Sequence, residues 1–356
     1  MKIIAIGLGQ CGAGVADEFS QLNHRSKTKG GFEIIPGVFA VSPSTADLVK
    51  PVAIETDFKH RILVGTERLK GSGVEGDSEL GATIMEEQAD LVIEAVRTNP
   101  DFYQIDAILL IAGAAGGFGS GALPVLARHL KSRFQGKIIY ALVILPFERE
   151  SNDDTRAAEN TANCLKSIEP IADAVFLVNN ELYRSKSLED DYMEINREIV
   201  KPFYNLLCAG AEKRKKHIGA KLLDAGDIIE TLGGWTVLAS SEVKIRSNLG
   251  DRIFHKESKQ IEGEAGIRAM DEALGTAMSL CKPEDALSAL YLIAAPSQDI
   301  NVSVIKSLGT YLKQSAPNAI LRSGDYPIGN QTMEVTIILS NLRDAEIVRR
   351  YHTPAN

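Results

Sequence analysis

Ten residues from Gly113 to Ala122, with the sequence GAAGGFGSGA, most constrain what this chain can fold into. Five of the ten are glycine, and the apolar run AILLIA leads directly into them. Glycine inside a helix or strand costs up to about 1 kcal/mol relative to alanine. Repeated glycine at one place therefore indicates that something approaches the backbone too closely for side chains.

Apolar strand-like segments and amphipathic helix-like segments alternate along the first half of the chain. The expected strands are Lys2–Gly9, Gly37–Ser42, Arg61–Gly65, Asp106–Gly113, Lys137–Pro146 and Asp173–Asn180, and the expected helices are Cys11–Leu22, Gly81–Thr98, Ala122–Phe134 and Thr155–Pro170. This alternation predicts an α/β fold with a mostly parallel sheet and helices on both faces. Ligands of such sheets bind at the carboxyl ends of the strands, where the glycine-rich and asparagine-rich loops lie.

The second half begins with a long helical stretch from Asp190 to Lys216, which Pro202 should kink or split. The polar segment Ser247–Glu262 is expected to be a loop, and helix and strand patterns then continue to Leu342. We therefore expect four parts: a parallel-sheet domain over 1–189, a connecting core helix over 190–218, a smaller α/β domain over 219–343 and a short tail over 344–356.

Composition excludes several classes of protein. A net charge of -8 gives no reason to expect nucleic-acid binding. The cysteines lie far apart and the six histidines show no ligand spacing, so we expect reduced thiols and no metal site. The charge-free segment 107–127 has glycines at its centre, which favours a strand–loop–helix unit over a transmembrane segment, and the N-terminus lacks the basic region of a signal peptide. We expect a cytoplasmic protein.

Three glycine-rich loops indicate phosphate binding. GLGQCG at Gly7–Gly12 fits G-x-G-x-x-G, but the second strand ends without the carboxylate that a nicotinamide enzyme uses to bind ribose. The Gly113–Ala122 loop and the segment Leu69–Ala82, LKGSGVEGDSELGA, supply further backbone N–H groups. No P-loop motif is present, so the pattern predicts a phosphate-rich nucleotide that is held by backbone N–H groups and not by lysine.

These loops also carry a family resemblance. GQCG at Gly9–Gly12 is similar to the first phosphate loop of tubulins, and AGGFGSG at Ala115–Gly121 resembles the G-G-G-T-G-S-G signature of the tubulin and FtsZ family. GSGVEGDSELG, from Gly71, resembles the third phosphate loop of that family. Together with INREIV at 195–200, the motifs look most like the archaeal CetZ branch, and the resemblance covers nearly the whole chain.

The resemblance implies a tubulin/FtsZ-like fold, in which a GTP-binding domain is joined by the core helix to a domain for GTPase activation and assembly. It implies a cytoskeletal GTPase that binds GTP or GDP, with Mg²⁺ held mainly by phosphates and water. Its expected partner is a second copy of itself in a head-to-tail protofilament, and its expected role is in cell shape.

Most nucleotide-binding residues that the resemblance implies lie in the loops. They are Gly9, Gln10, Cys11, Gly12, Ser42, Gly71, Gly73, Gly76, Gly116, Gly117, Phe118, Gly119 and Ser120. Cys11 would lie near the base or the sugar. Glu150 matches an acid that contacts the ribose, since a carboxylate accepts hydrogen bonds from sugar hydroxyls. The alternative for Glu150 is an ordinary surface acid.

Base recognition falls to amides in this family. Asn180, in NNELY, resembles the asparagine of the tubulin motif DNEAL, and Asn179 is the second choice. Tyr192 and Asn196 match the Tyr-x-x-x-Asn pattern of tubulins on the core helix. Residues four apart share a helix face, so Tyr192 would stack on guanine while Asn196 bonds its edge. The alternative is a tyrosine packed in the core beside a surface asparagine.

The resemblance also implies the catalytic residues. Asp224 and Asp227 match acids that follow the core helix in this family and that polarise water at the nucleotide of the next subunit. The alternative is that they cap the helix that follows.

Several departures from the family pattern favour slow hydrolysis. Phe118 replaces the signature threonine, Ala115 its first glycine, and Leu222 the asparagine expected before the two acids. Ser42 stands where asparagine is usual, and Pro43 removes a backbone donor beside it. The alternative function is therefore a guanine-nucleotide-binding regulator with weak hydrolysis and polymerisation.

Overall fold

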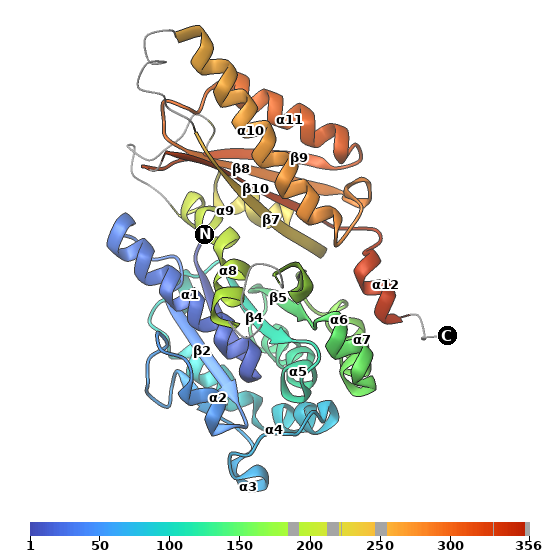
Figure 1. The fold of residues 1–356 in the computed structure, drawn as a ribbon. Coiled ribbons are helices and arrows are strands. Elements are labelled where there is room, and N and C mark those ends of the chain that lie inside the picture. Colours follow the sequence, from blue (N-terminus) through green and yellow to red (C-terminus); the bar gives the residue numbers. More distant parts are fainter. Residues whose placement is uncertain (184–191, 212–220, 222, 246–254, 330, 353–356) are drawn as a thin grey trace. The chain divides into compact units, whose positions relative to one another are not determined.

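A computed structural model describes residues 1–183, 192–211, 221, 223–245, 255–329 and 331–352, with the backbone alone for 255–262 and 352. The chain divides into two compact units (Figure 1). We call residues 2–201 and 347–356 the N-terminal unit, and Met1 with residues 202–346 the C-terminal unit. Each unit is described by itself.

The N-terminal unit is built on a six-stranded sheet in which every strand is parallel to its neighbours. The strands, in spatial order, are β3 (Arg61–Leu63), β2 (Gly37–Ser42), β1 (Ile3–Leu8), β4 (Ala107–Gly113), β5 (Ile138–Leu145) and β6 (Ala174–Asn179). Nearly all of their side chains are buried. In a parallel sheet that helices cover on both faces, strands are apolar along their whole length. Their sequences therefore do not alternate between apolar and polar residues.

Helices follow most strands of this unit. They are α1 (Gly9–Gly30), α2 (Thr45–Val49), α3 (Thr66–Leu69), α4 (Ser78–Arg97), α5 (Gly117–Arg133), α6 (Glu148–Asp153) and α7 (Thr155–Ile168), with the short 3₁₀ turns η1 (Phe102–Gln104) and η2 (Asn180–Tyr183). The carboxyl ends of all six strands lie along one edge, because the strands are parallel. The chain runs from β1 outward to β2 and β3 and then returns to β4 on the other side of β1. Such a switch point opens a crevice for ligands between β1 and β4.

Two helices of this unit begin with their backbones in contact. A Cβ built on Gly121 of α5 would lie 2.0 Å from the carbonyl oxygen of Ser78, at the start of α4. A Cβ on Gly117 would lie 2.5 Å from the nitrogen of Asp77, and one on Gly81 would lie 2.7 Å from the carbonyl oxygen of Gly117. No side chain fits at these three positions, so the glycines allow α4 and α5 to start against each other.

The C-terminal unit contains a four-stranded sheet in the order β7 (Gly234–Lys244), β10 (Thr332–Ser340), β8 (Ser288–Ala295) and β9 (Ile320–Pro327). β10 is antiparallel to β7 and β8, whereas β8 and β9 are parallel. The long helix α10 (His255–Met278) packs on β7 and β10 and lies beside α11 (Val302–Ser315), as Figure 1 shows. The remaining elements are α9 (Ala225–Thr231) and the 3₁₀ turn η5 (Pro283–Asp285).

The core helix is not split at Pro202. Helix α8 (Tyr192–Ala209) stays helical through Pro202, and the chain turns at Gly210. Residues 212–218, which we had included in the helix, lie outside the described residues.

Two expectations for polar segments were wrong. Residues 255–262 begin helix α10 and do not form a loop, because Lys, Glu and Gln are good helix formers even where a segment is polar all round. The expected short tail contains helix α12 (Glu346–His352), which buries Ile347 and Val348. Tyr351 and Ser151 place their hydroxyl oxygens 3.5 Å apart, which links this helix to α6.

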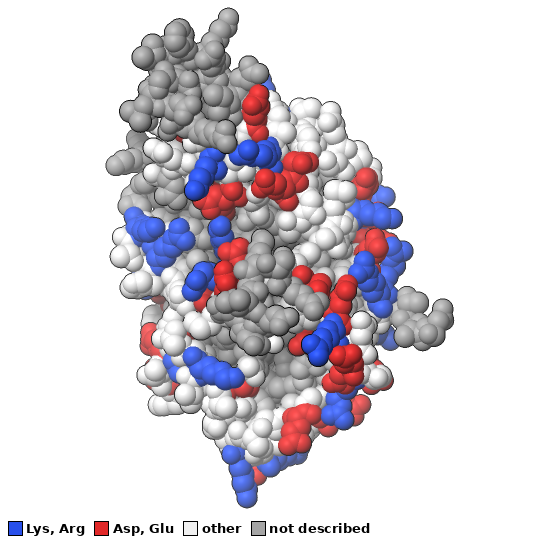
Figure 2. All heavy atoms as spheres, in the orientation of Figure 1, with Lys and Arg blue, Asp and Glu red and all other residues white. Residues whose placement is uncertain are grey.

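Charges of both signs are mixed on the face of the molecule that Figure 2 shows, where Lys and Arg side chains lie among Asp and Glu side chains. Among the described helices, none combines the length and the apolar composition that crossing a membrane requires.

We predict that Gly121→Ala destabilises the protein by about 3 kcal/mol, at the upper end of the usual cost of overpacking, because the added methyl group meets backbone atoms that cannot rotate away. The free energy of unfolding from denaturant titration measures the effect. Gly275→Ala in α10 is the matched control, since a Cβ there meets nothing within 4 Å. The control should stabilise by roughly 0.5–1 kcal/mol, and equal stability of the two variants would refute the backbone contact.

Candidate functional site

The candidate site forms where two helices begin at the switch point of the sheet. α1 starts at Gly9, directly after β1, and α5 starts at Gly117, four residues after β4. A Cβ on Gly9 would lie 3.5 Å from the nitrogen of Gly119, so the two helix starts are adjacent. Helix N-termini carry unpaired N–H groups and a partial positive charge. Two of them side by side form a site suited to a polyanion.

The signature glycines serve two purposes. A Cβ on Gly119 would lie 3.0 Å from the carbonyl oxygen of Gly113 and 3.2 Å from that of Leu8, so Gly119, like Gly117, is needed for backbone packing. A Cβ on Gly116 would meet no described atom within 4 Å. The prediction that a ligand alone accounts for these glycines was therefore incomplete. Among Gly116, Gly117 and Gly119, only Gly116 has no described atom near its Cβ position.

The side chains of the signature turn are directed into the protein. Phe118 is 5% exposed, and its ring lies 3.8 Å from the Cβ position of Gly9. The Ser120 hydroxyl donates to the carbonyl oxygens of Gly116 at 2.5 Å and Gly117 at 3.2 Å. This turn therefore presents backbone N–H groups, and neither side chain offers a hydroxyl to a ligand.

The third loop needs its glycines for their backbone conformation. Gly71, Gly73 and Gly76 have φ angles of +87°, +87° and +81°, which L side chains rarely adopt. The carbonyl oxygen of Gly71 accepts the N–H of Thr45 at 3.1 Å, which holds this loop against the start of α2.

Ser42 has a structural role in the second loop. Its side chain is fully buried, its hydroxyl donates to Asp47 at 2.7 Å, and it accepts the N–H of Ser44 at 3.1 Å. The hydroxyl of Ser42 is thus used in shaping the turn after β2.

The first turn of α1 brings Cys11 close to β4 and to α6. A Cβ on Gly113 would lie 3.2 Å from the Cys11 sulfur. Cys11 is partly exposed, yet burial raises the pKa of its thiol to about 12, and the negative charge of Glu150 adds to the rise. Glu150 is itself exposed and accepts the N–H of Phe147 at 3.1 Å, so one oxygen caps α6. Gln10 is exposed and Gly12 is buried in this turn.

Asn180 follows β6, at the same edge of the sheet. Its Oδ1 atom is buried and has no hydrogen-bond partner among the described residues. A buried acceptor without a partner costs roughly 1–3 kcal/mol, so such an atom indicates a missing donor. Asn179, the second choice, is 8% exposed, and its Oδ1 accepts the N–H of Glu181 at 3.0 Å. The unpaired atom therefore favours Asn180 as the contact to a ligand.

Asn196 of α8 lies over the start of α1. Its Nδ2 is 2.8 Å from the Cβ position of Gly14, so only glycine lets the amide lie there. One residue further along α8, Arg197 Nε is 3.9 Å from the carboxylate of Glu18. Burial raises the pKa of Glu18, and the charge of Arg197 opposes that rise. Tyr192 is 54% exposed, which rules out the alternative of a tyrosine in the core.

Asp224 and Asp227 lie in the C-terminal unit and form a capping box at the start of α9. Asp224 Oδ1 accepts the N–H of Asp227 at 2.8 Å, and Asp227 Oδ2 accepts the N–H of Asp224 at 3.4 Å. The capping alternative is thus present in the structure. Asp224 retains a second oxygen, and the second oxygen of Asp227, Oδ1, lies 3.9 Å from Nε of Arg322. Leu222 lies outside the described residues.

Two side-chain donors on α7 were not predicted from the sequence. Asn160 Nδ2 donates to the carbonyl oxygens of Gly76 at 3.0 Å and Ala115 at 2.9 Å, and Arg156 Nη1 donates to that of Glu75 at 3.1 Å. A signal for Asn160 was present, since it shares the apolar face of a predicted amphipathic helix with Cys164. A polar side chain on such a face requires a partner.

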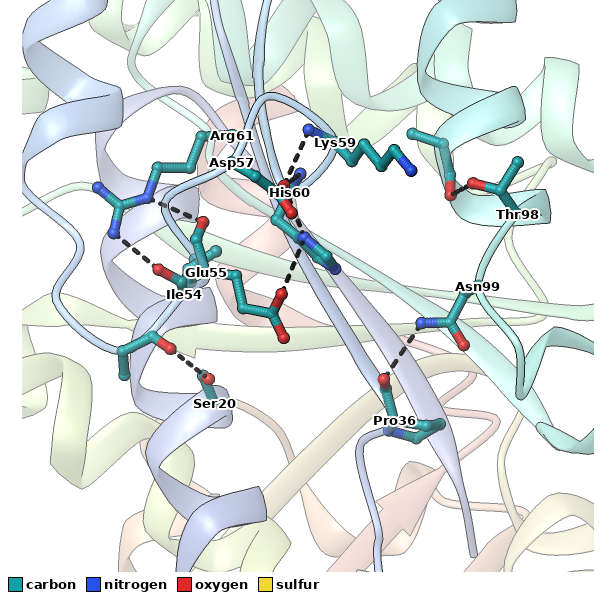
Figure 3. Close-up of polar contacts among 12 residues, drawn as sticks. Ser20, Pro36, Ile54, Glu55, Asp57, Lys59, His60, Arg61, Thr98 and Asn99 are labelled. Carbon is teal, nitrogen blue, oxygen red and sulfur yellow. Dashed lines mark hydrogen bonds and ion pairs between the residues drawn. The ribbon is translucent and has the colours of Figure 1, made fainter.

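One group of possible metal ligands occurs among the described residues, formed by Glu55, Asp57 and His60. Figure 3 shows them in the turn before β3, where His60 Nδ1 lies 2.8 Å from Asp57 and 3.5 Å from Glu55. Burial acts against the charged form of Asp57, but hydrogen bonds from His60 outweigh it and hold its pKa below the usual range. His60 pairs with both carboxylates, so the cluster is explained without an ion.

Comparison with known proteins identifies the relatives of this chain. Residues 2–185 match the model of the Tubulin/FtsZ family GTPase domain, and residues 185–356 match that of the Tubulin-like CetZ C-terminal domain. The tubulin-like protein CetZ1 of Haloferax volcanii is 32% identical, over 98% of this chain and 90% of that protein.

Two solved structures extend the similarity to the fold. CetZ1 from Haloferax volcanii, a GDP-bound monomer, has a TM-score of 0.81 at 28% identity over 99% of this chain and 97% of the other. CetZ2 from the same organism, a GTPγS-bound protofilament, has a TM-score of 0.80 at 27% identity over 99% and 96%. The chain belongs to the tubulin/FtsZ family and, within it, to the CetZ branch. The predicted tubulin/FtsZ-like α/β fold and the family resemblance are confirmed.

Cys11 gives a direct probe of this site. A pKa near 12 lowers the thiolate fraction on the order of a thousandfold relative to an unperturbed thiol, so we expect slow alkylation by iodoacetamide at pH 8. The rate should rise about tenfold per pH unit up to pH 10, because only the thiolate reacts. Mass spectrometry of the peptide containing Cys11 measures the rate.

Glu150→Gln should accelerate alkylation by removing a negative charge near the thiol, whereas Glu148→Gln, two residues earlier on α6, should not. A fast reaction of Cys11 in the unmodified protein, or equal rates for the two variants, would contradict this account of the thiol.

Proposed function

We propose that this chain is a GTPase that binds GTP at the paired starts of α1 and α5 and assembles head to tail into protofilaments. One observation carries the proposal: the two helix N-termini meet at the switch point of a parallel sheet, with Gly116 open to a ligand. The phosphate chain would lie on the backbone N–H groups of Gly9–Gly12 and Gly116–Gly119, since the N–H of Ser120 donates to the carbonyl oxygen of Gly116. Mg²⁺, held mainly by the phosphates and water, would neutralise part of their charge.

The base and sugar contacts of this proposal come from four side chains. The buried, unpaired Oδ1 of Asn180 would accept a hydrogen bond from guanine. Asn196, held over Gly14, would bond the edge of the base, and the exposed ring of Tyr192 would stack on it. Glu150 has one carboxylate oxygen beyond its capping bond to offer the ribose.

Hydrolysis in this proposal is completed by the next subunit. Asp224 and Asp227 would accept hydrogen bonds from the attacking water with the oxygens that do not cap α9. The GTPγS-bound protofilament of CetZ2, 27% identical to this chain, supports assembly of this kind. A site completed in this way makes hydrolysis depend on assembly, and we propose a role for the resulting filament in cell shape in the cytoplasm.

The first turn of α5 also supports a second candidate, a nucleotide-binding regulator with weak hydrolysis. Phe118 is buried, and Ser120 donates back to its own turn, so neither residue replaces the hydroxyl of the family's threonine. If only backbone N–H groups bound the phosphates, the affinity for the nucleotide would be retained, but the reacting phosphate would receive less catalytic assistance.

Phosphate release from GTP, measured against protein concentration, distinguishes the two candidates. We predict that the rate per subunit rises with concentration and falls at least about a hundredfold in Asp227→Asn, because a positioned acid contributes at least that factor. Asparagine keeps a side-chain oxygen for the capping bond, so α9 should still form.

Glu284→Gln is the matched control, because it neutralises an exposed carboxylate of the C-terminal unit outside α9. It should hydrolyse GTP at the unmodified rate. A rate per subunit that does not depend on concentration, with GTP bound, would favour the regulator.

We also predict that the protein prefers GTP to ITP by roughly 10- to 100-fold, because inosine lacks the 2-amino group and would leave the buried Oδ1 of Asn180 unpaired. Asn180→Leu should reduce the preference to less than about threefold, while Asn163→Leu on the exposed face of α7 should retain it. Competition binding measures both affinities. A preference that survives in Asn180→Leu would assign base recognition to other residues.

A further inference from the structure

Helix α7 holds two phosphate loops with a single side chain. The amide nitrogen of Asn160 has two hydrogens, and both are used: one bonds the carbonyl oxygen of Gly76 in the third loop and the other that of Ala115 in the signature loop. The side chain is 4% exposed, so water does not compete for these bonds. One turn earlier on the same face, Arg156 bonds the carbonyl oxygen of Glu75.

The third loop needs such support because of its conformation. Glu75 and Gly76 both have positive φ angles, of +49° and +81°. For Glu75 a left-handed backbone costs about 1–2 kcal/mol. Arg156 and Asn160 bond the two consecutive carbonyl groups of this strained turn, which favours the observed conformation over a relaxed one.

These bonds also fix the direction of backbone donors. All described peptide bonds are trans, so each N–H points opposite to the carbonyl group of the same peptide unit. Because the Ala115 carbonyl points toward α7, the N–H of Gly116 points away from α7. The Glu75 carbonyl likewise turns the N–H of Gly76 away from that helix. Among the described backbone hydrogen bonds outside helices and strands, neither N–H donates.

We propose that Asn160 is a positioning residue for phosphate binding, which joins the third loop to the signature loop and directs the N–H of Gly116 toward the phosphates. The inference rests on the proposed GTP binding. In it Asn160 acts through the two loops and contacts no part of the nucleotide. The two loops also meet where Gly117 contacts Gly76 and Asp77, and the amide of Asn160 sets the direction of their carbonyl groups. Loss of its donors therefore affects the phosphates and leaves the base and ribose contacts in place.

Asn160→Asp tests the proposal, because it has nearly the same shape and its carboxylate cannot donate to either carbonyl group. Asn163→Asp is the matched control, with the same change on the exposed face of the same helix. Competition against a fluorescent GTP analogue gives the affinities of GTP, GDP and GMP for each protein, with GMP at millimolar concentrations.

We expect Asn160→Asp to weaken GTP and GDP binding by about 10- to 100-fold, the usual effect of leaving buried polar groups unpaired. The affinity for GMP should change less than about threefold, because one phosphate uses little of the cradle. Asn163→Asp should match the unmodified protein for all three nucleotides. If the buried carboxylate prevents folding, Asn160→Ser retains one donor and should show a smaller loss in the same direction.

Three results would overturn the inference. Unchanged GTP affinity in a folded Asn160 variant would show that the loops hold their shape alone. An equal loss for GMP and GTP would show a general structural role. In both cases the unmodified protein still binds GTP and the proposed function stands. Failure of the unmodified protein to bind any guanine nucleotide would remove the proposed function and this inference together.

Discussion

The backbone contact between the starts of α4 and α5 is the constraint on which the candidate site depends. Gly81, Gly117 and Gly121 allow the two helices to begin against each other without a side chain between them. This contact places the end of the third loop, at Gly76 and Asp77, against the first turn of the signature helix. The two loops are thus in direct backbone contact, and the amide of Asn160 donates to a carbonyl oxygen in each.

In a site made of backbone N–H groups, affinity for phosphates and selectivity for a base depend on different types of residue. N–H groups of helix starts bind anions whatever the side chain, so affinity for phosphates depends on conformation and on glycine. Selectivity for a base requires side chains with fixed donors and acceptors, and in the proposed function these come from later elements, at Asn180 and Asn196. Changes in the glycines should therefore alter folding first, and changes in the asparagines should alter the choice of nucleotide.

Much of the fold could be predicted because the local patterns and the topology agree. Six apolar segments before six loops predict a parallel sheet, and the positions of the loops predict its functional edge. The sequence could not reveal which glycines face a ligand, since Gly117 and Gly116 look alike until α4 is placed beside α5. It also misjudged residues 255–262, where helix propensity outweighs polarity, and α12, where buried Ile347 and Val348 stabilise a segment that looked like a tail.

The capping box at α9 illustrates why a structural role and a proposed catalytic role need not compete. Capping uses one oxygen of Asp224 and one of Asp227, and it fixes the orientation of both carboxylates relative to the helix. An acid that must meet the nucleotide of another subunit benefits from such fixing, because a mobile side chain would lose entropy each time the interface formed. In the proposed mechanism the cap therefore orients the remaining oxygens toward water. Asparagine at position 227 separates the two roles, since it retains the cap and removes the charge.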